Sequence, residues 1–135
     1  MALLEFLLKV AKFLVPFWKR RKRYLLIVED NQNDVTLFMA CVPEGIECDV
    51  ANTCEEAAGM MKSKPYSIVF LDCRMPSMQG HELYKIIRDR HPNICIVITP
   101  SVTQDLDKFP KSEPITVIIK PVTAHSIKHI LKAGC

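Results

Sequence analysis

The sequence predicts an α/β domain built on a doubly wound, five-stranded parallel sheet. Short apolar runs that end in polar residues recur from residue 24 onward, and in four of the five runs the apolar residues occupy both faces. Parallel strands covered by helices on both sides show this pattern. Stretches with helical spacing separate the runs. The predicted strands are YLLIVED at 24–30, IECDVA at 46–51, SIVFLD at 67–72, ICIVIT at 94–99 and ITVIIK at 115–120.

Four helices are predicted between and after these strands. Thr53 and Glu56 form a T-x-x-E capping box at the start of the second helix, and the last helix covers 123–133. Between 101 and 114, Pro110 and Pro114 leave room for little more than two turns, so a helix there is short or absent. The apolar faces are Val35/Phe38/Met39/Val42, Ala57/Met60/Met61, Leu83/Ile86/Ile87 and Ile127/Ile130/Leu131.

Length and composition indicate one soluble domain. The chain has 135 residues, of which 49% are apolar and 24% are charged. With 4 glycines, 9 prolines and no long biased tract, the composition excludes collagen-like, disordered and internal-repeat classes.

The charge is unevenly distributed. Residues 1–23 carry seven Lys/Arg and one Glu, a net charge of +6, whereas residues 24–135 carry eleven Lys/Arg and fourteen Asp/Glu, a net charge of −3. An acidic domain repels phosphate backbones, so we expect no nucleic-acid partner.

The six cysteines predict reduced thiols in a cytoplasmic protein. They include no C-x-x-C pair and no spacing suited to zinc, and no secretory signal accompanies them. The cysteines are Cys41, Cys48, Cys54, Cys73, Cys95 and Cys135.

The N-terminal segment, residues 1–23, is predicted to be an amphipathic and basic extension of a domain at 24–135. Residues 2–18 are apolar except for Glu5, Lys9 and Lys12, which share one narrow stripe of a helix, and the basic run KRRKR follows at 19–23. The charges stand on the wrong side for a signal peptide, and the apolar stretch is short and interrupted for a membrane-spanning helix.

Three roles remain open for this extension. It can lie on the anionic inner face of a membrane, pair with its own copy, or dock in an apolar groove of a partner protein. The predicted apolar face consists of Leu3, Leu4, Phe6, Leu7, Val10, Phe13, Leu14 and Phe17, with Trp18 at headgroup level.

Polar residues with complementary chemistry stand at the ends of four predicted strands. Glu29 and Asp30 end the first strand, Asp72 the third, Thr99 the fourth and Lys120 the fifth. Because the carboxyl ends of parallel strands meet at one edge, we expect these groups to converge. The clustered carboxylates favour Mg²⁺, Asp72 is the natural nucleophile for a phosphoryl group, and Lys120 and Thr99 suit its oxygens.

Residues 24–133 resemble the receiver domain of bacterial two-component response regulators. The resemblance rests on VEDN at 28–31, DCRMPSMQG at 72–80, Thr99 and the Lys120-Pro121 pair. It implies a flavodoxin-like fold with strand order 2-1-3-4-5, and a cis peptide before Pro121.

The resemblance also implies the chemistry of the site. Asp72 would be the phosphoacceptor, charged by the phosphohistidine of a sensor histidine kinase or phosphotransfer protein. Glu29, Asp30, Asp72 and the backbone carbonyl of Arg74 would hold Mg²⁺. Such a domain catalyses only its own phosphotransfer and dephosphorylation. Arg74 stands where phosphatases of the haloacid-dehalogenase type need a second Asp, which argues against that enzyme class.

Three departures from the family pattern support an alternative function. Pro100 follows Thr99 and lacks the backbone N–H that relatives offer to a phosphoryl oxygen, Val117 replaces a frequent aromatic residue, and the fourth helix is reduced. The chain is therefore either a single-domain receiver that signals through a downstream protein, or a degenerate receiver that binds partners without phosphorylation.

Three residues of the 72–80 motif and the helix after it have weaker predicted roles. The side chain of Arg74 is expected either to pair with Glu29 or to tune the lifetime of the acyl phosphate. Cys73 is expected to be a packed thiol, and His81 a surface residue.

Overall fold

The computed structural model describes residues 2–19 and 23–135, with the side chains of residues 2–10 and 23–135. Part of the predicted apolar face and most of the basic run lie outside the described side chains. The residues of the face concerned are Phe13, Leu14, Phe17 and Trp18.

The sheet confirms the predicted fold class. Its five strands are all parallel and lie in the order β2-β1-β3-β4-β5. They are β1 (Tyr24–Val28), β2 (Glu47–Ala51), β3 (Ile68–Leu71), β4 (Cys95–Ile98) and β5 (Thr116–Val117). Strands β1, β3, β4 and β5 stop before the polar residues that end their apolar runs, so these residues lie just beyond the sheet edge. The sheet pairing of β5 continues past its end through backbone bonds from Ile118 to Ile98 and from Lys120 to Pro100, both 2.9 Å.

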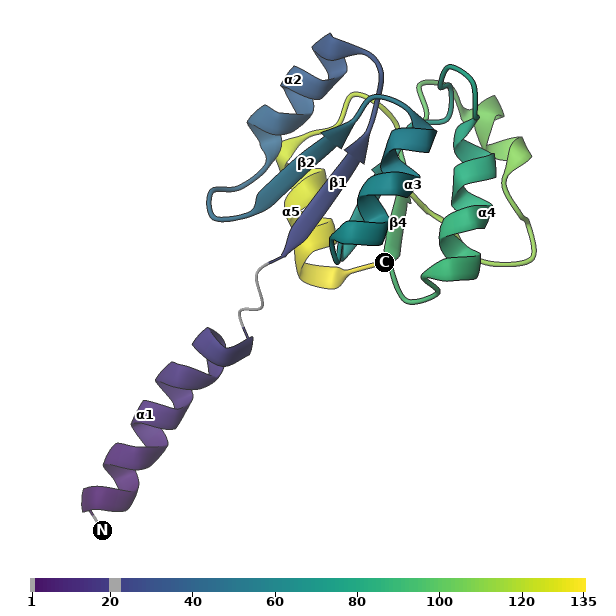
Figure 1. The fold of residues 1–135 in the computed structure, drawn as a ribbon. Coiled ribbons are helices and arrows are strands. Elements are labelled where there is room, and N and C mark those ends of the chain that lie inside the picture. The colour runs from purple at the N-terminus through teal and green to yellow at the C-terminus, as the bar shows by residue number, and fades with distance from the viewer. Residues whose placement is uncertain (1, 20–22) are drawn as a thin grey trace.

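Four helices cover the sheet in two layers (Figure 1). Helices α3 (Cys54–Ser63) and α4 (Gly80–Arg90) pack on one face, with a core that includes Leu26, Val69 and Leu83. Helices α2 (Gln32–Cys41) and α5 (Ala124–Ala133) pack on the other face, where Phe70 contacts Phe38 edge to face at 4.6 Å between ring centroids. Apolar strand residues therefore serve both layers, as the sequence predicts.

Side chains fix the starts of three helices. The Asn31 side chain accepts bonds from the backbone of Asn33 and Asp34 at the start of α2, and Thr123 accepts one from Ser126 at the start of α5. At α3, Thr53 accepts from the Glu56 N–H as predicted. The Glu56 carboxylate instead accepts from the N–H of Asn52, at 3.1 Å, one residue before the expected partner.

The segment between β4 and β5 contains a 3₁₀ helix, η1 (Thr103–Lys108), in place of a full fourth helix. The prolines that follow it predict this reduction. Phe109 ends η1, is almost fully buried, and meets the ring of Tyr84 on α4 edge to face at 5.5 Å. It also meets the ring of His81 on α4 at 6.4 Å, and these aromatic contacts attach the short helix to the α4 layer.

The cysteine prediction is wrong for one pair: Cys95 and Cys135 form a disulfide, with Cα atoms 5.4 Å apart. Cys95 begins β4 and Cys135 follows α5, which runs back across the sheet, so both reach the amino edge of the sheet. A separation of 40 residues has no recognisable sequence signature. The described residues contain four free cysteines, and Cys73 is buried as predicted.

Helix α1 (Ala2–Lys19) confirms the helix predicted for the N-terminal segment. Figure 1 shows it standing away from the two layers of the sheet domain. Within the described residues, no helix is both long enough and apolar enough to cross a membrane.

The disulfide is expected to stabilise the fold. Replacing Cys135 with Ser should lower the free energy of unfolding by about 2–4 kcal/mol, because the bond closes a long loop of the unfolded chain. Urea denaturation measures the change, and reductant should lower the stability of the wild type but not of Cys135→Ser. Thiol titration of the denatured, unreduced protein should find only the four free cysteines. Six reactive thiols would contradict the bond.

Candidate functional site at the carboxyl edge of the sheet

Backbone hydrogen bonds just beyond the strands bring the predicted site residues together. The N–H of Asp72 donates to the carbonyl of Val28 at 3.1 Å, and that of Thr99 to Leu71 at 2.9 Å. These bonds continue the ladders of β1, β3 and β4 by one residue, and the bond from Lys120 to Pro100 holds the chain three residues past the end of β5. Each functional side chain is therefore fixed by the sheet itself.

Three carboxylates form the acidic cluster expected from the sequence. Glu29, Asp30 and Asp72 place one oxygen each within 4.8 Å of the others. Glu29 and Asp72 are buried, whereas Asp30 is exposed. An all-oxygen set with one open side suits Mg²⁺, which keeps several waters in its coordination shell. The residues present therefore fit Mg²⁺, the metal that the resemblance implies.

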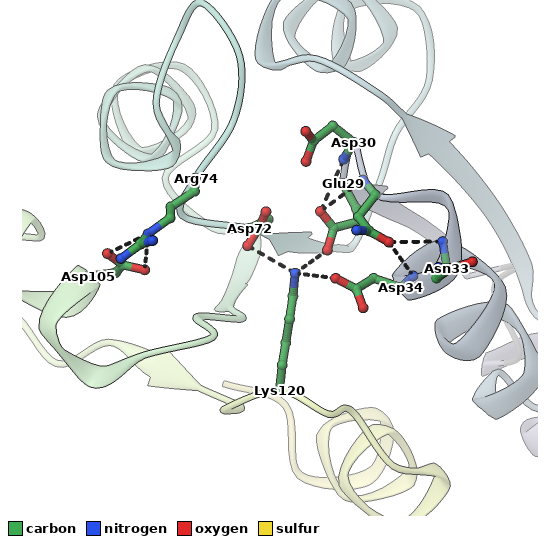
Figure 2. A network of polar contacts seen from close by, with 9 residues as sticks. Glu29, Asp30, Asn33, Asp34, Asp72, Arg74, Asp105 and Lys120 are labelled. Carbon is green, nitrogen blue, oxygen red and sulfur yellow. Dashed lines mark hydrogen bonds and ion pairs between the residues drawn. The ribbon is translucent and has the colours of Figure 1, made fainter.

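Lys120 lies opposite the cluster and contacts three carboxylates (Figure 2). Its ammonium is 3.0 Å from an oxygen of Asp34 and 3.1 Å from an oxygen of Asp72, and it donates a hydrogen bond to Glu29. The lysine side chain is only 15% exposed, so solvent screens these pairs weakly.

Asp34 is a member of the site that the sequence analysis missed. It lies in the first turn of α2, where the Asn31 cap fixes the helix start close to Glu29. Its position five residues after Glu29 is a signal that could have been used, because the first turn of a helix that follows β1 lies at the same edge of the sheet.

The electrostatics of the site favour an added cation. Burial raises the pKa of Glu29 to about 8, the hydrogen bond from Lys120 opposes the shift, and the neighbouring Asp72 adds to it. Burial alone would lower the pKa of Lys120, but its bonds to Glu29 and Asp34 and the charge of Asp72 raise it. When Glu29 is ionised, one ammonium is set against four carboxylates, those of Glu29, Asp30, Asp34 and Asp72. A divalent cation would neutralise the excess negative charge and favour the ionised form of Glu29.

Arg74 does not pair with Glu29, which corrects one of the two expectations for its side chain. Its Nε donates to both oxygens of Asp105 on η1, at 3.2 and 3.1 Å (Figure 2). Asp105 is buried and needs a partner for its charge, whereas Glu29 already has Lys120. Sequence reasoning missed Asp105 because the two residues are 31 positions apart.

The segments around Thr99 and Lys120 meet at the carboxyl edge of the sheet. Thr99 is buried at the site edge, and the Lys120-Pro121 peptide is cis, as the resemblance implies. Pro100 lacks an N–H, but its carbonyl accepts the N–H of Lys120 at 2.9 Å. Val117 packs against the α3/α4 core, so its position holds an aliphatic residue rather than an aromatic one.

Close packing explains why the 72–80 motif ends in glycine, at Gly80. A Cβ atom at this position would lie 2.2 Å from the carbonyl oxygen of Asp72. The Gly80 N–H donates to the carbonyl of Cys73 at 3.1 Å, so the start of α4 packs directly on the backbone of the site loop. Any side chain here would displace Asp72.

The chain belongs to the response regulator receiver domain family, whose model matches residues 25–132. Among similar proteins, hybrid signal transduction histidine kinase B of Dictyostelium discoideum is 31% identical over 94 residues, which cover 69% of this chain and 5% of that protein. The aerobic respiration control sensor protein ArcB of Escherichia coli strain K12 is 26% identical over 113 residues, which cover 80% of this chain and 14% of that protein. The chain therefore spans a small part of the length of these relatives.

Solved structures show the same fold. A two-component response regulator from Clostridium difficile is 26% identical with a TM-score of 0.73, and the match covers 83% of this chain and 94% of that one. Response regulator protein TrrA from Thermotoga maritima, solved in complex with Mg²⁺ and BeF, is 24% identical with a TM-score of 0.67, covering 82% and 96% of the two chains. Members of this family are signalling phosphoacceptors rather than ordinary enzymes.

Removing the charge of Lys120 should destabilise the domain in the absence of divalent cations. At pH 9, above the raised pKa of Glu29, Lys120→Gln leaves the buried Glu29 and Asp72 carboxylates without their cation, and we expect a loss of about 3–5 kcal/mol in the free energy of unfolding. Urea denaturation in the presence of a chelator measures it. The matched control is Lys128→Gln on the exposed surface of α5, which should change stability by less than about 0.5 kcal/mol. Equal, small effects would mean that Lys120 does not balance the buried acids.

Proposed function

We propose that this chain accepts a phosphoryl group on Asp72 from the phosphohistidine of a sensor histidine kinase or phosphotransfer protein. The carrying observation is the convergence of a buried Asp72 with the Lys120 ammonium at 3.1 Å and with two further acids, Glu29 and Asp30, in a receiver fold. The kinase names of the similar proteins support a histidine kinase as donor.

The geometry supports a simple transfer. An oxygen of Asp72 attacks phosphorus, the bond from phosphorus to the donor imidazole breaks, and the electron pair stays on the imidazole nitrogen. The Lys120 ammonium then pairs with a phosphoryl oxygen in place of the Asp72 carboxylate, and the Thr99 hydroxyl donates a hydrogen bond to another phosphoryl oxygen. Neutralisation of charge on the phosphoryl oxygens is the chemistry that Mg²⁺ would supply, held by Glu29, Asp30, Asp72 and the Arg74 carbonyl.

The unit proposed to perform this transfer is the domain at residues 24–135. We place it in the cytoplasm. Its only other reaction is loss of the phosphoryl group. Its output is a contact with a downstream protein. A second candidate function is binding of a partner without phosphorylation. Pro100 and the reduction of the fourth helix to η1 favour that alternative.

Phosphorylation should require both Asp72 and Mg²⁺. Incubation with acetyl phosphate should add one phosphoryl group by intact-mass spectrometry, and chelation of divalent cations or Asp72→Asn should abolish it. The control is Asp89→Asn, an exposed acid on α4, which should be modified like the wild type. An unmodified wild type that also fails to bind beryllofluoride would establish the phosphorylation-independent alternative.

Replacing Pro100 with Ala should stabilise the phosphorylated form. The substitution supplies an N–H beside Thr99, and a hydrogen bond to a charged group is worth about 1.5–3 kcal/mol, or roughly ten- to a hundred-fold in affinity. Beryllofluoride affinity and the half-life of phospho-Asp72 measure the gain. Equal values for the two proteins would show that another group already fills this place.

A further inference from the structure

The first turns of α1 carry an unusually apolar exposed surface. Five large side chains of this helix are between 53% and 70% exposed, although a folded domain normally buries such residues. They are Leu3, Leu4, Phe6, Leu7 and Leu8. Among residues 2–10, whose side chains the structure describes, only Glu5 and Lys9 interrupt this surface. Exposure of such an apolar area to water is unfavourable, so burial against a partner would lower the free energy.

The width of the apolar surface indicates what kind of partner it needs. At about 100° per residue, the apolar positions among residues 2–10 spread over about 240° of the helix circumference, and Glu5 and Lys9 occupy a narrow remaining wedge. A coiled-coil partner covers a narrow seam and leaves polar flanks. A lipid surface can bury a broad apolar arc, because acyl chains adapt to its shape.

Charge points to the same partner. The run of Lys19 to Arg23 follows the helix directly, whereas residues 24–135 carry a net charge of −3. Arg23 donates a hydrogen bond to the carbonyl of Leu131, near the end of α5, so the end of the basic run is held against the domain. The exposed Lys132 adjoins that carbonyl. Positive charge therefore gathers where α1 joins the domain.

The topology separates the junction between α1 and β1 from the proposed phosphorylation site. The segment enters the domain at Tyr24, the first residue of β1, and the acidic cluster begins at Glu29, just past the last residue of the same strand. The junction with α1 and the site thus lie at opposite edges of the sheet (Figure 1). A molecule held through α1 leaves Asp72 open to a kinase.

We propose that α1 and the Lys19–Arg23 run together bind an anionic lipid surface. The apolar arc enters the acyl boundary, and the basic run pairs with headgroup phosphates or carboxylates, at the amino edge of the sheet. Binding is independent of phosphorylation, so this proposal and the proposed function stand or fall separately.

The test is flotation of the full-length protein with lipid vesicles. Vesicles of phosphatidylcholine with 30% phosphatidylglycerol should carry the protein, and pure phosphatidylcholine should carry at least tenfold less. Raising NaCl from about 0.1 to 0.5 M should weaken binding at least several-fold. Asp72→Asn should float like the wild type.

Two double variants with the same type and number of substitutions separate the two faces of α1. Leu3→Gln with Leu7→Gln removes two side chains from the middle of the apolar arc and should lower the partition coefficient at least tenfold. The control, Glu5→Gln with Lys9→Gln, changes the polar wedge and also leaves the net charge unaltered; it should bind within about twofold of the wild type. Replacing residues 19–22 with Gln, with Arg23 kept, should lower binding to anionic vesicles at least tenfold.

Three results would overturn the proposal. The first is equal binding to neutral and anionic vesicles. The second is equal loss of binding in the two face variants. The third is a protein that stays in solution with anionic vesicles but sediments as a dimer that Leu3→Gln with Leu7→Gln makes monomeric, which would assign the helix to self-association. Circular dichroism and thermal unfolding of each variant establish that the sheet domain is intact.

Discussion

The ion pairing of Lys120 is the constraint on which the rest of the site depends. Two buried carboxylates, Glu29 and Asp72, stand side by side at the end of neighbouring strands, and their burial without a cation would cost several kcal/mol. Lys120 reaches both from the β5 edge of the sheet, where its backbone N–H is held by the Pro100 carbonyl. The strand order, with β1 and β3 adjacent and β4 and β5 beyond them, is what allows one ammonium to face these acids.

Most of the fold could be predicted because local patterns of apolar and polar residues determine the layer architecture. Apolar runs with both faces hydrophobic require two covering layers, and the helical spacings between them supply those layers. The boundaries were less predictable. The sequence pattern includes a polar residue such as Glu29 in the strand, but β1 ends at Val28 and Glu29 lies beyond it, in the site. Pro110 and Pro114 correctly predicted a reduced fourth helix, though not that it would be 3₁₀.

The candidate site was predictable where each residue ends a strand, and unpredictable where a residue arrives from elsewhere. Asp34 reaches Lys120 from a helix, and Asp105 reaches Arg74 from a 3₁₀ helix. The disulfide joins the first residue of β4 to the last residue of the chain. Contacts of this kind depend on where helices end and cross the sheet. Periodicity predicts that the helices exist, but it does not fix these end points to within one residue.

The connections of the site to its surroundings differ in strength, and this difference determines which parts can rearrange. Lys120 is held by three carboxylates and by the backbone bond to Pro100 in a largely buried setting, so its position is tightly fixed. The Arg74–Asp105 pair is different, because the arginine side chain is 71% exposed whereas Asp105 is buried. A shift of the loop after Asp72 that broke this pair would leave the Asp105 carboxylate buried without its partner, unless η1 moved as well and exposed it to water. The loop and η1 are therefore coupled through this pair, while the buried ring of Phe109 holds η1 to α4. The segment around η1 is thus directly linked to the loop after Asp72, whereas Val117 provides no aromatic side chain that could link the site to β5.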